Sequence, residues 1–173
     1  MTLTLDGLNA LPAREAGELL RACCGSSRWA DAMLARRPFE RIADLLEAAD
    51  DAWRATGPRD WDEAFAHHPR IGERRAAAPV SAEAVAWSAE EQSAAAGAAP
   101  AARAALAEAN EAYERRFGRI YIVCAAGRSA EEMLADIAAR MQNDPERERA
   151  IAAEEQRKIT RLRLKTLIGA RET

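Results

Sequence analysis

The chain has only two histidines, and they stand side by side at His67 and His68 with a proline directly after them. A residue before proline is disfavoured in the α conformation, so we expect a helix to end here and His68 to leave the helical register. An imidazole titrates near neutral pH and could move a proton in a reaction. A histidine that only caps a helix C-terminus is the structural alternative. Adjacent histidines rarely chelate one ion, so no metal site is predicted.

Two glutamates lie between the neutral polar side chains of Ser88 and Gln92 in Ser88-Ala89-Glu90-Glu91-Gln92. Ser88 and Glu91 have the spacing of a capping box, which would place both on the first turn of a helix. The N–H groups of a first turn can hold an anion. The capping and the ligand-binding interpretations are therefore compatible here.

One arginine stands out near the C-terminus. At about 100° per residue, the apolar side chains of the last predicted helix form one broad arc, and Arg163 falls inside it. A buried guanidinium is costly unless a carboxylate or an anionic ligand pairs with it. A structural ion pair, or a side chain that reaches out to water, would explain Arg163 as well. Arg161 lies on the opposite, polar side, where we expect it to be solvated.

Helix-forming residues dominate the chain, and glycine and proline interrupt them at short intervals. We predict an all-α, single-domain helical bundle of about eight helices that covers residues 1–173. The predicted helices span residues 11–23, 27–36, 40–55, 60–67, 81–95, 100–116, 130–142 and 145–169. Ser129 has the spacing of a capping box, and Asp144 stands as a cap before Pro145.

The segment Ile120-Tyr121-Ile122-Val123-Cys124 breaks the helical pattern, because short β-branched apolar runs favour extended backbone. No second run could pair with it in a sheet. We therefore predict one short, buried extended link near residues 120–125. Its backbone N–H groups must find partners other than a sheet, and a ligand could be one of them.

Composition narrows the classes of function. Of 173 residues, 49% are hydrophobic and 31% are charged, which is typical of a globular domain. A net charge of -3 disfavours nucleic-acid binding. No apolar run is long enough to cross a membrane, and no secretory signal is visible at the N-terminus. The three cysteines form neither a disulfide framework nor a Cys-x-x-Cys motif, so we expect a cytoplasmic protein.

Several motifs follow one another along the chain. They are Cys24-Gly25-Ser26-x-Arg28-Trp29, Arg37-Pro38-Phe39, His68-Pro69-Arg70-Ile71-Gly72, Ser88-x-x-Glu91-Gln92, Asn110-x-x-Tyr113-x-x-x-Phe117-Gly118 and Leu162-Arg163-Leu164. In this order they resemble the motifs of the OHCU decarboxylases (2-oxo-4-hydroxy-4-carboxy-5-ureidoimidazoline decarboxylases). A His-Pro-x-x-Gly motif alone would be a weak signal, but the ordered set covers nearly the whole chain and is specific.

The resemblance implies an all-helical, usually dimeric enzyme that uses neither cofactor nor metal. The implied reaction decarboxylates the ureidoimidazoline carboxylate to (S)-allantoin, which is the last step from urate to allantoin. By resemblance, His68 and Glu91 are the catalytic pair, and Arg163 is the arginine that holds the substrate during the reaction. The other implied substrate-binding residues are Pro69, Ser88, Gln92 and the backbone of Tyr121, Ile122, Val123, Cys124 and Ala125.

The sequence departs from the family pattern in two places. Ala94-Ala95-Ala96-Gly97 stands where a Gly-Ala-Gly run is frequent, which leaves the geometry of that turn open. Arg119-Ile120-Tyr121 stands where aromatic residues are frequent. The resemblance gives His67 no role.

Two other classes of function stay open at this point. One is a non-catalytic helical domain that binds a small anionic heterocycle, with His68 and Glu91 acting only as caps. The other is a DNA-binding domain, whose only candidate basic face is the cluster at residues 161–165. The excess of acidic over basic residues ranks this second class last.

Overall fold

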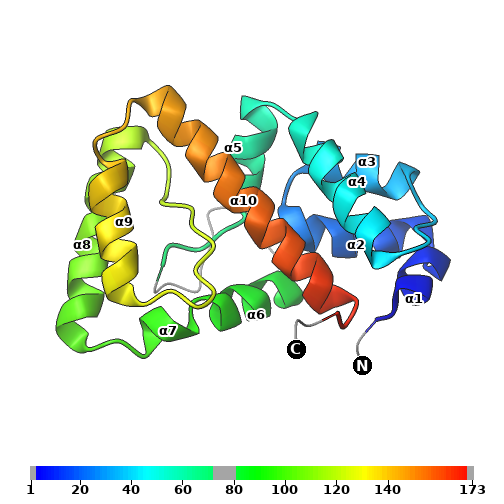
Figure 1. Ribbon diagram of the computed structural model, residues 1–173, viewed down its shortest axis with the longest axis horizontal. Helices are drawn as coiled ribbons and strands as arrows, with labels where there is room; N and C mark the ends of the chain where they lie inside the picture. The colour runs from blue at the N-terminus through cyan, green and yellow to red at the C-terminus, as the bar shows by residue number, and fades with distance from the viewer. Residues whose placement is uncertain (1–2, 72–80, 171–173) are drawn as a thin grey trace. The chain divides into compact units, whose positions relative to one another are not determined.

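The computed structural model describes residues 3–71 and 81–170, and this part of the chain forms ten α-helices and no β-strand (Figure 1). The predicted all-α fold is confirmed. The helices are α1 (Leu5–Ala10), α2 (Ala13–Cys24), α3 (Ser27–Ala35), α4 (Ile42–Arg54), α5 (Pro58–Ala66), α6 (Ala82–Glu91), α7 (Ser93–Ala96), α8 (Pro100–Phe117), α9 (Ala130–Arg140) and α10 (Pro145–Leu167).

The described helices exceed the predicted number for two local reasons. Helix α1 was not predicted, and its N-terminus is capped by Thr4, whose hydroxyl accepts a hydrogen bond from the Gly7 N–H at 3.0 Å. The helix expected over residues 81–95 is broken at Gln92, whose φ and ψ of -95° and 10° are not helical. The motif departure at residues 94–97 falls in the short helix α7, which ends at Gly97 with a φ of -82°. The alanines there suit a helix, and this turn needs no positive φ.

The predicted caps explain where the later helices begin. Ser129 and Glu132 form the expected capping box at the start of α9. The Asp144 carboxylate accepts hydrogen bonds from the N–H groups of Glu146 and Arg147, at 3.1 and 2.9 Å. Side chains of this kind satisfy donors that a helix N-terminus otherwise leaves without a partner.

The chain divides into two compact units. Unit 1 contains residues 1–64 and 157–173, and unit 2 contains residues 65–156. Helix α10 runs without interruption from residue 145 to residue 167, so its first part belongs to unit 2 and its last part to unit 1. That the chain forms a single domain stays a prediction.

In unit 1, the motif that starts at Cys24 builds the junction of α2 and α3. Gly25 ends α2 with a φ of 87°, a conformation that glycine adopts without strain. The Ser26 hydroxyl caps α3 by accepting a hydrogen bond from the Trp29 N–H. The buried Trp29 indole donates to the Ala49 carbonyl at 3.0 Å and so ties α3 to α4. These residues serve the fold.

The motif at residues 37–39 also has a structural task in unit 1. The Arg37 guanidinium donates to the carbonyl oxygens of Leu8 and Leu11, at 2.8 and 3.0 Å. The Asn9 side chain exchanges two hydrogen bonds with the backbone of Phe39, at 2.8 and 2.9 Å. The motif therefore fixes helix α1 against the segment that follows α3.

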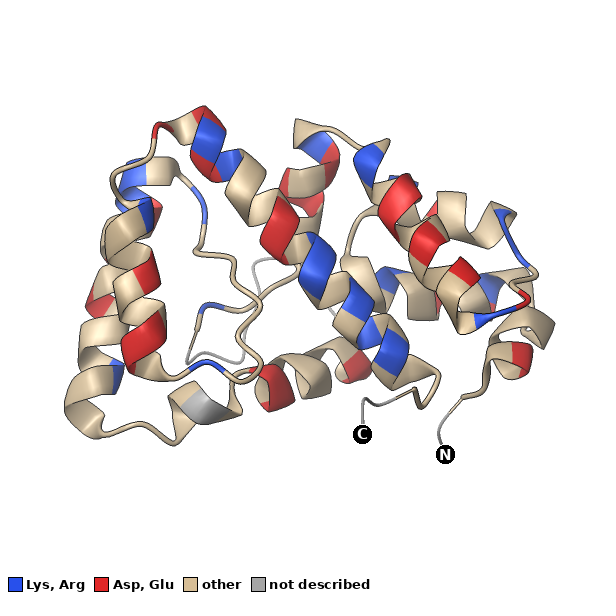
Figure 2. Cartoon of the chain, viewed as in Figure 1, with Lys and Arg blue, Asp and Glu red and all other residues tan. Residues whose placement is uncertain are grey.

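The basic cluster near the end of α10 is partly neutralised within unit 1. Asp50 accepts from Arg157 at 2.8 Å and from Arg161 at 2.7 Å. The prediction that Arg161 is merely solvated was wrong, because a carboxylate of α4 faces it. Figure 2 shows acidic and basic residues mixed along the helices. This pairing weakens the DNA-binding interpretation.

In unit 2, helices α8 and α9 lie side by side (Figure 1). The buried residues between and around them include Leu106, Tyr113, Met133 and Ile137. The segment after α8 has no regular secondary structure from residue 120 to residue 125, and Tyr121, Val123 and Ala125 belong to the same core. The predicted buried extended link is confirmed.

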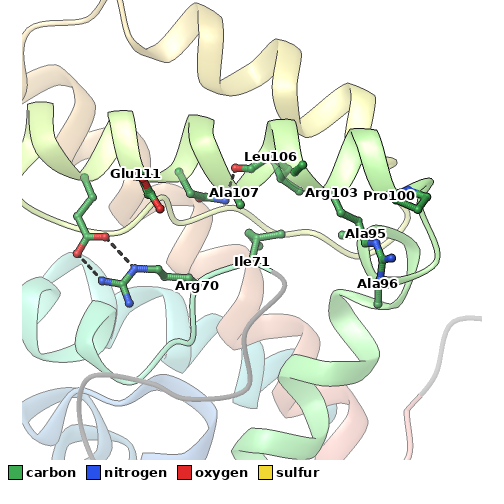
Figure 3. A pocket seen from close by; sticks show the side chains of 12 residues that line it. Arg70, Ile71, Ala95, Ala96, Pro100, Arg103, Leu106, Ala107 and Glu111 are labelled. Carbon is green, nitrogen blue, oxygen red and sulfur yellow. Dashed lines mark hydrogen bonds and ion pairs between the residues drawn. The ribbon is translucent and has the colours of Figure 1, made fainter.

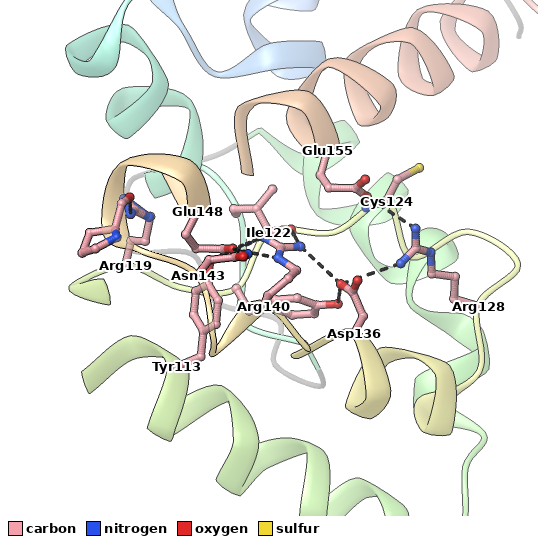
Figure 4. A network of polar contacts seen from close by, with 12 residues as sticks. Tyr113, Arg119, Ile122, Cys124, Arg128, Asp136, Arg140, Asn143, Glu148 and Glu155 are labelled. Carbon is pink, nitrogen blue, oxygen red and sulfur yellow. Dashed lines mark hydrogen bonds and ion pairs between the residues drawn. The ribbon is translucent and has the colours of Figure 1, made fainter. Parts of the chain in front are cut away.

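A buried polar network holds this link in place (Figure 4). The Glu148 side chain is 0% exposed and receives hydrogen bonds from Tyr113, Arg140 and Asn143. The Arg140 guanidinium also donates to the Ile122 carbonyl at 2.9 Å. Arg140 thus connects a buried carboxylate to the backbone of the link.

In the described residues, no helix has the length and apolar character that a membrane span requires.

Candidate active site

His68 lies just beyond the end of α5, as predicted. The helix ends at Ala66, and the His68 N–H donates to the Phe65 carbonyl at 3.1 Å. The His68 side chain is only 7% exposed, and Pro69 after it is buried. Its ring atom Nε2 lies 2.7 Å from Oε1 of Gln156, a residue of α10. His68 is therefore part of the interior of unit 2.

Ser88 and Glu91 do not form the predicted capping box. Ser81 caps α6 by accepting a hydrogen bond from the Ala84 N–H at 3.2 Å. Ser88 and Glu91 instead lie in the last part of α6, so the anion-binding first turn expected there was wrong. Residues three and four apart share one face of a helix, so Ser88 and Glu91 lie on the same face, and Gln92 follows directly at the helix end. Ser88 is buried, and Glu91 and Gln92 are half-buried.

Glu91 is close to the extended link. Burial raises the pKa of the Cys124 thiol, and the negative charges of Glu155 and Glu91 raise it further. Glu155 also accepts a hydrogen bond from the Cys124 N–H at 2.8 Å, and it lies 3.8 Å from the Arg128 guanidinium (Figure 4). The charges of one carboxylate of α6 and one of α10 therefore both act on Cys124.

Two consecutive residues of α10 organise this part of unit 2. Glu155 holds the backbone of Cys124, and Gln156 contacts the ring of His68. The histidine and the link are thereby brought to the same turn of α10. Unit 2 therefore contains an imidazole held by an amide, and two carboxylates whose charges act on Cys124; that these groups line one site stays a prediction. Such a set can orient a polar substrate and move a proton.

The predicted contribution of the link is only partly open to a substrate. The Cys124 N–H is donated to Glu155, and the Ile122 carbonyl accepts from Arg140. The Ala125 carbonyl accepts from the Arg128 N–H at 3.0 Å. Other groups of the protein thus already form hydrogen bonds with part of the backbone that the resemblance assigned to substrate binding. That Tyr121 to Ala125 contact substrate stays a prediction.

Arg163 is nearly buried, at 2% exposure, within unit 1. Its guanidinium donates to the Ala22 carbonyl at 3.4 Å, near the C-terminal end of α2. Burial raises the pKa of the neighbouring Cys24 to about 11, an effect that the positive charge of Arg163 partly offsets. A cation is favourable at this end of a helix. Since Arg163 belongs to unit 1, its membership of the site with His68 and Glu91 stays a prediction.

Gln156 and Glu155, which contact His68 and Cys124, are candidate site residues that the sequence interpretation missed. A usable signal was present, because Gln156 is seven residues before Arg163 and lies about 20° from it around the helix. It therefore falls inside the same apolar arc that made Arg163 stand out. A buried polar side chain requires a partner whether it is charged or neutral.

A separate cavity of about 610 Å³ lies in unit 2 beside α7 and α8 (Figure 3). None of the predicted site residues lines it. Arg70, which follows His68-Pro69, reaches Glu114 through two hydrogen bonds of 2.8 and 2.9 Å. The lining contains no histidine, so the cavity is a weaker candidate for proton chemistry.

Among residues 3–71 and 81–170, no cluster of three or more His, Cys, Asp or Glu could hold a metal ion.

The sequence matches the family model described as OHCU decarboxylase over residues 9–165. The chain belongs to the OHCU decarboxylase family. It is 39% identical over 150 residues to the uric acid degradation bifunctional protein TTL of Arabidopsis thaliana. It is also 42% identical over 59 residues to a 2-oxo-4-hydroxy-4-carboxy-5-ureidoimidazoline decarboxylase of Amia calva. The matches cover 86% and 34% of this chain, but only 46% and 34% of those relatives, so the chain spans less than half of each.

Solved structures agree with this family. A crystal structure of an OHCU decarboxylase in the presence of (S)-allantoin is 36% identical, with a TM-score of 0.73 and coverage of 88% of this chain and 98% of that chain. A crystal structure of an (S)-allantoin synthase has a TM-score of 0.69 and covers 96% of this chain and 54% of that one. At 21% identity, this second likeness shows the fold alone.

Proposed function

We propose that this chain decarboxylates 2-oxo-4-hydroxy-4-carboxy-5-ureidoimidazoline to (S)-allantoin, the last step from urate to allantoin. Membership of the OHCU decarboxylase family supports the reaction. The observation that carries the proposal is the buried His68, held by Gln156 at 2.7 Å in the unit that also contains Glu91. Burial and this hydrogen bond hold the ring in one orientation, which proton transfer to a bound substrate requires.

The chemistry explains why the chain can work with ordinary side chains. Loss of CO2 leaves an electron pair on the ring carbon, and the neighbouring C=N group of the substrate can accept that pair. A proton then adds to the ring to create the stereocentre, so one proton is consumed for each CO2 released. The substrate supplies the electron sink that cofactors supply elsewhere. The protein has to orient the substrate, stabilise charge and deliver the proton to one face.

We assign the roles as follows. His68, together with Glu91, assists the loss of CO2 and relays the proton, which suits a group that titrates near neutral pH. Gln92 and Ser88, close to Glu91 along α6, hold polar groups of the substrate. Arg163 stabilises negative charge through its planar donors. The backbone of residues 121–125 and Pro69 complete the substrate contacts.

The proposal also covers the oligomeric state and the cellular location of the protein. We propose a homodimer in the cytoplasm, which the resemblance and the cysteine usage favour. The mass of the protein in solution, measured by light scattering, tests the first part. A mass of one chain at micromolar concentration would contradict it.

The reaction is tested by circular dichroism of the product. The substrate also decays without enzyme, so only optically active allantoin reports on catalysis. We expect the circular dichroism signal of (S)-allantoin to grow at an initial rate that is proportional to protein concentration. If the protein bound the substrate and the product stayed racemic, the chain would be a binding domain and the proposed function would be wrong.

A further inference from the structure

The contact between His68 and Gln156 indicates which ring nitrogen of the histidine carries a hydrogen. Atoms Nε2 of the ring and Oε1 of the amide are 2.7 Å apart, a normal hydrogen-bond distance. Both side chains are buried, at 7% and 0% exposure. An amide oxygen can only accept a hydrogen bond. With the amide oriented so that its oxygen faces the ring, the ring nitrogen carries the hydrogen.

We propose that Gln156 is a positioning residue that keeps a hydrogen on Nε2 of His68. The other ring nitrogen, Nδ1, is then the atom through which His68 takes up or gives the proton. This inference rests on the proposed decarboxylation, and it names the reacting atom of the histidine. It adds Gln156 to the site as a residue that acts through His68.

The geometry supports this role in both protonation states of the histidine. A neutral ring with its hydrogen on Nε2 donates to the amide oxygen, and the imidazolium donates in the same way. The hydrogen bond therefore survives while Nδ1 gains or loses its proton. A partner that keeps one ring nitrogen occupied fixes both the tautomer and the orientation of a histidine.

The anchor of this hydrogen bond is itself well held. Gln156 lies within a helix of 23 residues. Its neighbour Glu155 accepts the Cys124 N–H at 2.8 Å, which ties the same turn of α10 to the extended link. Because the amide is neutral, it orients the ring without adding charge. In the proposed site the charged partner of the histidine is Glu91, from a different helix.

Nitrogen NMR of the histidine rings tests the proposal without substrate. With only two histidines in the chain, a His67→Asn variant assigns both sets of signals. We expect the spectrum of His68 to show hydrogen on Nε2 and a ring proton protected from exchange with water. Hydrogen on Nδ1 of neutral His68 instead would overturn the proposal.

Two variants at position 156 separate positioning from simple packing. Gln156→Met keeps the length of the side chain and removes the acceptor, so the protected ring proton should vanish and kcat should fall about tenfold with little change in KM. Gln156→Glu keeps an acceptor oxygen and should retain the hydrogen on Nε2. A Met variant with an unchanged ring proton and unchanged kcat would overturn the proposal.

The proposed function and this inference fail in different ways. If wild-type protein gave no optically active allantoin, the decarboxylase function would be wrong, whatever the ring spectrum. If activity were normal but neutral His68 carried its hydrogen on Nδ1, only the role of Gln156 would be wrong. Should the Met variant fail to fold, the wild-type and Glu spectra still decide the tautomer.

Discussion

Two carboxylates of unit 2 have opposite surroundings. Glu148 is 0% exposed and is surrounded by an arginine, a tyrosine and an asparagine that donate to it. Glu91 is half-buried at the end of a helix, and its charge raises the pKa of a thiol on the extended link. The first carboxylate has a protein donor on every side that is described, whereas the second remains partly accessible to solvent.

We take this difference to separate a structural network from the proposed reactive site. Buried charges with several donors stabilise one arrangement of the chain, and removing one partner leaves the other charge uncompensated. A half-buried acid can exchange protons without disrupting the core. We therefore expect changes in the Arg140 network to reduce stability and changes near His68 to reduce catalysis.

The largest effect is expected for His68→Asn. Loss of a general acid or base typically reduces the rate by about 10²- to 10⁴-fold. The free energy of unfolding should fall by only about 1–3 kcal/mol, because the buried Gln156 amide loses its ring partner. The matched control is His67→Asn, which removes the neighbouring imidazole and should keep the formation of (S)-allantoin near the wild-type rate. Equal losses in both variants would contradict the assignment of His68.

Arg140→Met should show the reverse pattern. The change leaves the Glu148 charge buried without its guanidinium, and we expect unfolding in urea to require about 3–5 kcal/mol less free energy. Arg14→Met is the control, because Arg14 and Glu18 form a pair whose side chains are 88% and 64% exposed. That variant should lose less than about 1 kcal/mol. A similar loss of unfolding free energy in the two variants would show that the buried network stabilises the fold no more than an exposed ion pair does.

Arg163→Lys keeps the positive charge but removes the planar set of donors. If Arg163 contacts the substrate, kcat/KM should fall by about 10- to 100-fold, the value of one or two charge-assisted hydrogen bonds. The melting temperature should change little, since lysine can still approach the Ala22 carbonyl. A variant that melts earlier and turns over substrate normally would assign Arg163 to packing alone.

Glu155→Gln should give the smallest effect. The amide can still accept the Cys124 N–H, so the fold should persist. Glu155 raises the pKa of Cys124, and removing its negative charge should therefore lower that pKa. Alkylation of Cys124 by iodoacetamide, followed from pH 7 to pH 10, should then begin at a lower pH than in the wild type. The buried Cys23 and Cys24 should react slowly in both proteins. An unchanged pH profile would contradict the contact between Glu155 and Cys124.

The sequence predicted the fold better than the details of the site. The helical pattern, the cap at Ser129 and the extended link near 120–125 are local features, and residues close in sequence decide them. The capping box at Ser88 was a wrong prediction, because the same spacing also occurs inside a helix. Here Ser81 provides the cap one turn or more earlier. Spacing alone does not decide which of two serines begins a helix.

The partners of the site residues were beyond the reach of local patterns. His68 and Gln156 are separated by 88 positions, and Cys124 and Glu155 by 31. Only the packing of α10 brings these residues together. Gln156 could have been suspected from its place in the apolar arc of α10, but its contact with a histidine could not have been predicted. The family resemblance predicted which residues react, but not which residues hold them in place.

The central claim is that His68 and Glu91 act as one unit on one substrate, and a double-mutant cycle tests it most directly. The measurement is kcat/KM for (S)-allantoin formation in His68→Asn, in Glu91→Gln and in the double variant. Groups that work as a unit give strongly non-additive losses. We predict that the double variant is about as slow as His68→Asn alone. If the fold-loss in kcat/KM of the double variant equalled the product of the two single losses, the two residues would act independently. That result would contradict the claim.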